Sequence, residues 1–367
     1  MSSIDGYKSL NLDGKGSELL KISIVNTILS IITFGIYYFW AKVRVKKFFH
    51  ANTELLGGRF DYHVTGKEKF IAFIKASLIM SGVFGIIGGI PYFLSYFNIS
   101  PLISQIAGVI FFYLLIGLAA PLLTVASRRF TLSRTSWNNI HFKFAGHVKP
   151  LYKIMSKGIL LSICTLGFYI PWYICELRKF THENSKLGKI PFKYTGEGRE
   201  IIKYFLIFII ILLAYSSYLI FSVFPVIKTN LMEAQQNQTH IALEGEAGFT
   251  LLLPLLFILY YIWLYIKLYK YHWENTAFQK YHFRCNITVS KFILNFIKAV
   301  LTAVLTAGIG LPWSVIIMKR YLLGTIHISE NTDVAAILAA PDEESSALAE
   351  AIDEAGDAFD AIADFLG

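Results

Sequence analysis

The sequence has 367 residues, of which 55% are hydrophobic and only 16% are charged, and its mean hydropathy is +0.52. Soluble domains carry about 25% charged residues, so this composition argues against an ordinary soluble domain and indicates a membrane protein. The net charge is +9, but all 34 Lys and Arg precede residue 321, whereas eleven of the 25 acids lie at or after Glu330. The basic residues occupy short loops between apolar segments, which is typical of membrane topology rather than of nucleic-acid binding.

Three regions follow from this pattern: a polar segment at residues 1–18, a membrane domain at 19–329 and an acidic tail at 330–367. The membrane domain contains seven apolar segments. Four of them are long enough to cross a bilayer, which takes about 20 residues; the other three resemble one another. The long segments are 70–96, 102–126, 201–227 and 249–269, and the similar ones are 19–40, 151–172 and 292–313.

The three similar segments share the motif Thr-x-Gly-x4-Trp, with Pro before Trp in two copies. Such self-similarity indicates a repeated structural unit. We expect Gly to mark a turn or break and Trp to anchor the segment at the membrane interface. The motif residues are then either structural or line a pathway. The motif residues are Thr33, Gly35, Trp40, Thr165, Gly167, Trp172, Thr306, Gly308 and Trp313.

A second motif occurs four times and predicts β-hairpins. Each copy has a Thr or Ser and, seven residues later, a Phe. A two-residue turn between them places both on one apolar face. We expect turns at 56–57, 138–139, 188–189 and 279–280, and Pro191 favours an edge position for its strand. The motif residues are Thr53 and Phe60, Thr135 and Phe142, Ser185 and Phe192, and Thr276 and Phe283.

Charge distribution discriminates between two topologies. If all seven apolar segments cross the membrane, Lys and Arg divide almost evenly between its two sides. If only the four long segments cross, nearly all Lys and Arg residues fall on one side of the membrane, as the positive-inside rule requires. We therefore expect a multi-pass α-helical membrane protein with four long spanning helices, three repeated re-entrant or interfacial segments and four cytosolic β-hairpins. Seven spans are the alternative. The repeats and both termini are then cytoplasmic.

The tail is rich in Ala and acids, and its apolar residues recur at helical spacing, as in Leu348, Ile352, Ala355 and Phe359. This pattern predicts an amphipathic helix. Such a helix either docks on the basic cytosolic layer or remains solvated.

The run from Thr33 to Arg44, followed by Asn52-Thr53 and Phe60-x-Tyr62, resembles the YjgN-like family of bacterial inner-membrane proteins. The resemblance extends through the repeats over roughly residues 15 to 325. The third copy departs from it, because Gly310 replaces Tyr and no Asn-Thr hairpin follows Trp313. The resemblance implies a location in the bacterial inner membrane and no particular chemistry.

No catalytic, cofactor or metal motif is recognisable in the sequence. Asn26, Lys157 and Lys298 lie within the repeated segments and are candidates for lining a polar cavity, although interfacial or interhelical contacts also explain them. We expect a non-catalytic scaffold or lipid-interacting protein whose partners are membrane lipids, chiefly anionic lipids of the inner leaflet, and not nucleic acid. The alternative is a channel or transporter lined by the re-entrant segments. The absence of carboxylates from the centres of the long segments favours the first function.

Overall fold

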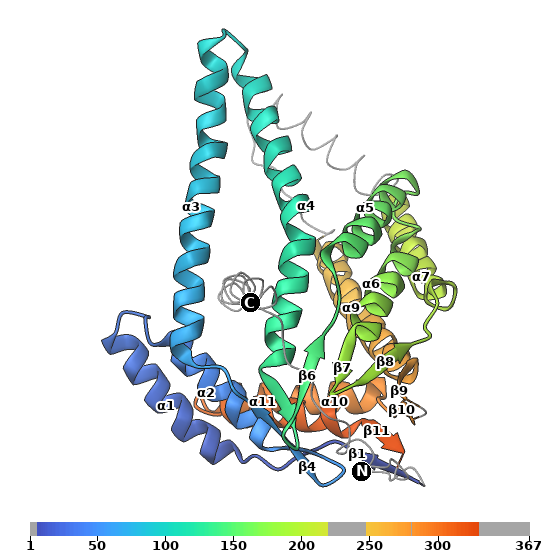
Figure 1. Cartoon of the computed structure of the whole chain (residues 1–367). Coiled ribbons are helices and arrows are strands. Elements are labelled where there is room, and N and C mark those ends of the chain that lie inside the picture. The colour runs from blue at the N-terminus through green and yellow to red at the C-terminus, as the bar shows by residue number, and fades with distance from the viewer. Residues whose placement is uncertain (1–5, 219–246, 280, 330–367) are drawn as a thin grey trace.

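The computed structural model describes residues 6–218, 247–279 and 281–329. Its strands form one antiparallel sheet at one end of the molecule, and the helices extend from that sheet (Figure 1). The strands are β1 (Tyr7–Ser9), β2 (Asn11–Leu12), β3 (Thr53–Leu55), β4 (Gly58–Tyr62), β5 (Thr135–Trp137), β6 (Ile140–Phe144), β7 (Ser185–Leu187), β8 (Ile190–Tyr194), β9 (Thr276–Phe278), β10 (Tyr281–Cys285) and β11 (Ile326–Ser329). The helices are α1 (Gly16–Ile32), α2 (Tyr38–Ala51), α3 (Gly66–Tyr96), α4 (Pro101–Ser133), α5 (Val148–Cys164), α6 (Ile170–Glu183), α7 (Gly198–Tyr218), α9 (Ala247–Glu274), α10 (Val289–Leu305) and α11 (Leu311–Gly324).

The four predicted hairpins have the predicted register. In each, the residues flanking the two-residue turn are paired, as Leu55 is with Gly58 and Trp137 is with Ile140. The other two pairs are Leu187 with Ile190 and Phe278 with Tyr281. Leu56 and Gly57 both have positive φ, at 52° and 80°, as the turn type that matches the strand twist requires.

The four hairpins, expected as cytosolic units beside four or seven spans, are parts of one eleven-stranded sheet. The N-terminal segment closes this sheet. Its first half, β1, pairs with β11, its second half, β2, pairs with β3, and Leu10 alone separates the two halves. The sheet is therefore a nearly closed barrel. Closure leaves few open edges, which explains how short strands form a stable sheet.

Two helices in the described residues, α3 and α4, are long and apolar enough to cross a membrane. Their most apolar windows have mean hydropathies of 2.1 and 2.4, and only 12% and 11% of these windows is buried within the molecule. Figure 1 shows them as a long hairpin that extends away from the sheet. The prediction of four spans with three re-entrant segments, and the alternative of seven spans, are wrong for this part of the chain.

Two other predicted spans have one end packed against protein. The predicted spans 201–227 and 249–269 overlap α7 and α9. Ile201 of α7 and Ile266 of α9 are 0% and 2% exposed. They pack into two protein clusters, Ile201 with Tyr194 of β8 and Ile266 with Cys285 of β10. Other apolar residues of these helices, such as Leu213 and Leu256, are 62% and 54% exposed, so contact with protein covers only part of each run.

Candidate functional site

The three Thr-x-Gly motifs occupy the turns of three short helix pairs, α1–α2, α5–α6 and α10–α11. Thr33 Oγ1 donates to the Leu29 carbonyl at 2.7 Å and accepts from the Tyr37 amide at 2.9 Å, so one hydroxyl ends the first helix and begins the second. Gly35 has φ +88°, a conformation that glycine adopts without strain. The other copies repeat these contacts, Thr165 with Leu161 and Tyr169, and Thr306 with Thr302 and Gly310.

The motif Trp residues begin the second helix of each pair and pack against a glycine at the start of another helix. A Cβ atom at each of these glycines would lie within 2.6 Å of a Trp atom, so only glycine fits. The contact of Trp313 with Gly16 joins the α10–α11 pair to α1, the first helix of the chain. The pairs are Trp40 with Gly66, Trp172 with Gly198 and Trp313 with Gly16.

The hairpin motif residues have two structural roles. Each Thr or Ser hydroxyl donates to a carbonyl in the last turn of the preceding helix, as Thr53 does to Phe49 at 2.7 Å; Thr135, Ser185 and Thr276 make the same bond. The Phe residues form the apolar inner face of the barrel. The rings of Phe60, Phe142 and Phe192 are stacked in sequence, with centroids 6.3 and 6.5 Å apart, and Phe283 belongs to the same cluster.

The three candidate cavity residues belong to three different helix pairs. Asn26 is 6% exposed and donates to the Ala41 carbonyl at 3.3 Å, while its Oδ1 has no hydrogen-bond partner among the described residues. Lys157 forms an ion pair with Glu176, with Nζ and Oε1 2.8 Å apart. Lys298 lines a cleft. The structure therefore places only Lys298 in the site described below.

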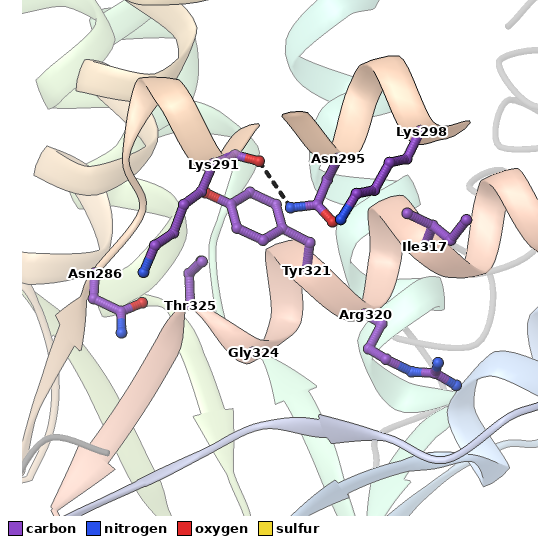
Figure 2. Close-up of a pocket in the computed structure, with 9 residues that line it drawn as sticks. All are labelled: Asn286, Lys291, Asn295, Lys298, Ile317, Arg320, Tyr321, Gly324 and Thr325. Atoms are coloured by element: carbon purple, nitrogen blue, oxygen red, sulfur yellow. Dashed lines mark hydrogen bonds between the residues drawn. The ribbon is translucent and has the colours of Figure 1, made fainter. Parts of the chain in front are cut away.

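That cleft lies between α10 and α11 where these helices meet the sheet, and has a volume of about 500 Å³. Figure 2 shows Lys291, Asn295 and Lys298 on α10, with Tyr321 of α11 beside them and the Arg320 side chain pointing away from α10. Among the described residues, its lining contains three cations and no carboxylate. Asn286, Ile317, Gly324 and Thr325 complete the lining.

Several polar groups of the cleft are already held in place by the fold. Asn295 Nδ2 donates to the Lys291 carbonyl at 2.8 Å. Arg320 donates from Nε and Nη2 to the carbonyls of Leu12 and Gly14, at 3.0 and 2.8 Å. These bonds fix the guanidinium beside the N-terminal segment. Neither Lys291 nor Lys298 has an ion-pair partner within the part of the chain that the structure describes.

Comparison of the helix pairs shows how the third pair differs. Because α5 and α10 both have 17 residues and α6 and α11 both have 14, their positions correspond. Lys157 and Lys298 are each the tenth residue of their helix. Glu176, the partner of Lys157, corresponds to Ile317. The third pair thus keeps the lysine and lacks its neutralising carboxylate.

Two further residues make the third pair polar, and the sequence analysis did not identify them. Lys291 corresponds to Glu18 in the first pair and Pro150 in the second, and Asn295 corresponds to Ile22 and Ile154. The sequence signal for these two residues lies in the differences between the repeats, whereas the motifs are defined by what the repeats share. The cleft is suited to an anion with several oxygens, such as a phosphate group.

A second polar cluster is buried where β8 meets α6 and α9. Tyr194 Oη and His272 Nδ1 share a hydrogen bond of 2.6 Å, and Cys175 Sγ lies 3.8 Å from Tyr194 Oη. Burial, together with the nearby charges of Arg178 and His182, lowers the pKa of His272 to about 3. Burial also raises the pKa of the Cys175 thiol and of the Tyr194 hydroxyl. The cluster is therefore neutral at physiological pH, which suits a structural role better than a nucleophilic one.

A family model described as "Bacterial protein of unknown function (DUF898)" matches residues 8–355. The inner membrane protein YjgN of Escherichia coli O157:H7 is 29% identical over 180 residues, which cover 48% of this chain and 40% of that protein. YjgN of Escherichia coli K12 is 29% identical over 164 residues, covering 41% and 37%, and YjgN of Salmonella typhimurium LT2 is 29% identical over 180 residues, covering 48% and 41%.

The match therefore spans about two fifths of the length of these relatives. No solved structure matches the chain. The resemblance inferred from the repeated motifs is confirmed by these comparisons.

Proposed function

Because this chain belongs to the DUF898 family of bacterial proteins, and its curated relatives are inner membrane proteins, we propose that it is a non-catalytic, lipid-interacting protein of the bacterial inner membrane. In this proposal the α10–α11 cleft binds the phosphate of an anionic phospholipid of the inner leaflet. The observation that carries it is the cleft's set of cations, which has no carboxylate among the described lining residues.

The cleft offers what a phosphate headgroup needs. Lys291 and Lys298 supply ammonium groups, and Arg320, held by the carbonyls of Leu12 and Gly14, adds a third positive charge to the lining. Lysines near the membrane surface each contribute about 1 kcal/mol to the attraction of anionic lipid. A zwitterionic headgroup has no net charge, so the cleft favours an anionic lipid over it.

The surface beside the cleft suits an acyl chain. Leu294, Ile297 and Leu301 of α10 are 52%, 47% and 50% exposed, and at helical spacing they form a stripe. This stripe runs next to the polar one made by Lys291, Asn295 and Lys298. A lipid bound with its phosphate in the cleft would therefore have an apolar helix surface alongside its chains.

The test is native mass spectrometry of the purified full-length chain in detergent, titrated with phosphatidylglycerol or phosphatidylcholine. We expect phosphatidylglycerol to bind more tightly. Lys298→Ala should weaken its binding about tenfold, since a charge-assisted hydrogen bond contributes about 1.5–3 kcal/mol. Ile317→Glu should weaken the binding of phosphatidylglycerol similarly. The new carboxylate would neutralise Lys298, as Glu176 neutralises Lys157 in the second helix pair.

Lys157→Ala is the matched control, since it removes the corresponding lysine from a pair in which that lysine is already neutralised. Its affinity for phosphatidylglycerol should equal that of the wild type. Equal affinity for the two lipids, or an equal loss in the Lys157 and Lys298 variants, would refute a specific site in the cleft.

A further inference from the structure

The inner face of the barrel encloses a cavity of about 200 Å³ that the cleft proposal does not involve. Twelve side chains line it within the described residues, and all of them are apolar. They come from every strand between β3 and β11, together with Leu10 from the N-terminal segment, Leu56 from a hairpin turn and Trp273 from the end of α9. Such a site accepts apolar side chains and excludes charged ones.

The cavity reaches the end of the barrel where the hairpins turn. Leu56, which lies in the first of these turns, is part of its lining. Leu56, Phe60, Phe142 and Phe192 are all only half-buried. The apolar interior is therefore partly open at this end, which is the end remote from the helices.

The C-terminal strand leaves the barrel at the same end. Ile326, which follows α11, pairs with Cys285 near the helices, whereas Ile328 pairs with Phe283 closer to the turn. Residues 330–367 follow directly after β11 and lie outside the described residues. The tail is thus connected to the chain beside the mouth of the cavity.

The tail and the opening of the cavity are complementary in charge and in the distribution of apolar residues. The tail has eleven acids and no Lys or Arg. Lys8, opposite Ile328 in the sheet, and Lys189, in the third hairpin turn, lie at the turn end of the barrel. Leu348, Ile352 and Phe359 are among the tail residues that fall on one face of a helix.

We propose that the tail docks in cis at this end of the barrel, with apolar side chains such as Phe359 inserted into the cavity and its acids facing the basic rim. The tail is the occupant favoured by its tethering, because a tethered segment has a high effective concentration at its site. A second copy of the chain and a free apolar ligand are the competing occupants. This inference does not depend on lipid binding in the α10–α11 cleft.

The test is photocrosslinking in the purified full-length chain. Leu56→p-benzoylphenylalanine places the probe at the cavity mouth, and Asp61→p-benzoylphenylalanine places it on the outer face of β4 as a control. Trypsin leaves the tail in one peptide, residues 321–367, because no Lys or Arg follows Arg320. We expect this peptide to be crosslinked within the same chain from position 56 and not from position 61.

Phe359→Asp should reduce the crosslinked yield several-fold, whereas Ala361→Asp, on the opposite face of the expected helix, should leave it unchanged. If the Leu56 variant does not fold, the probe is placed in the tail instead, as Phe359→p-benzoylphenylalanine. Crosslinks from this position to barrel peptides are then expected. Crosslinks between two chains, or no crosslink between tail and barrel from either position, would overturn docking in cis.

Discussion

At the scale of single residues, the buried contact between Tyr194 and His272 connects the sheet to α9. His272 is 4% exposed, and its neighbours include the guanidinium of Arg178. A proton added to this imidazole would be buried beside another positive charge, so the folded state binds it much more weakly than the unfolded chain does. The contact therefore makes folding sensitive to acid.

The pKa of His272 in the folded protein is about 3, below its ordinary value of 6.5. Between these values the unfolded state binds more protons, so stability decreases as the pH falls from about 6.5 towards 3. The decrease from this residue is at most about 1.4 kcal/mol per pH unit. His272→Gln should show a shallower decrease in thermal unfolding midpoint between about pH 7.5 and pH 5. An unchanged pH dependence would exclude His272 as the cause.

At the scale of elements, helix starts are positioned by Trp–Gly contacts. Gly198 begins α7 against Trp172, and a Cβ at Gly198 would lie 2.6 Å from the Trp172 Cα and 2.7 Å from its backbone nitrogen. Backbone atoms cannot rotate away as a side chain can. The contact therefore fixes the position of α7 relative to the α5–α6 pair.

Gly198→Ala should destabilise the protein by about 1–3 kcal/mol, the usual range for overpacking a close contact. Gly82→Ala is the matched control, because it lies within α3 and a Cβ there meets no atom within 4 Å. Thermal unfolding in detergent measures both variants. A Gly198→Ala protein as stable as the Gly82→Ala protein would contradict the role of the Trp–Gly contact.

The hairpins were predictable because their register depends on local pairing around a two-residue turn. Whether the hairpins associate into one sheet could not be decided from the sequence, since this depends on contacts between segments far apart in sequence. Pro191 illustrates the difference. It predicted an edge strand, which was wrong, because β8 is paired on both sides. Pro191 is tolerated because the pairing of β8 with β9 begins only at Phe192.

The cleft was only partly predictable for a similar reason. Lys298 was identified because it is a charge within an apolar segment, and it does line the cleft. Arg320 was not identified, because it lies in a basic stretch that resembles the stretches in the other copies. Its placement depends on bonds to the carbonyls of Leu12 and Gly14, at the opposite end of the chain. Sequence spacing gives no information about such a contact.

At the scale of the whole molecule, the first and last elements complete the same barrel. β11 follows α11 as β3 follows α2, and it pairs with β1 rather than with a strand that follows it in the sequence. The hairpin motif is missing after Trp313, and the structure supplies the reason: the partner of β11 is β1, at the N-terminus. The nearly closed barrel therefore places the ends of the helices around one ring, with α3 and α4 extending from it (Figure 1).

We propose that the barrel faces the cytosol, where the α10–α11 cleft would meet the inner leaflet. The most direct test is the labelling of single cysteines by a membrane-impermeant thiol reagent in a Cys164→Ser background, since Cys175 and Cys285 are buried. Asp61→Cys marks the outer face of the barrel, and Asn98→Cys marks the turn between α3 and α4. We expect position 98 to be labelled in intact cells and position 61 to be labelled only after permeabilisation. Labelling of position 61 in intact cells would contradict this proposal.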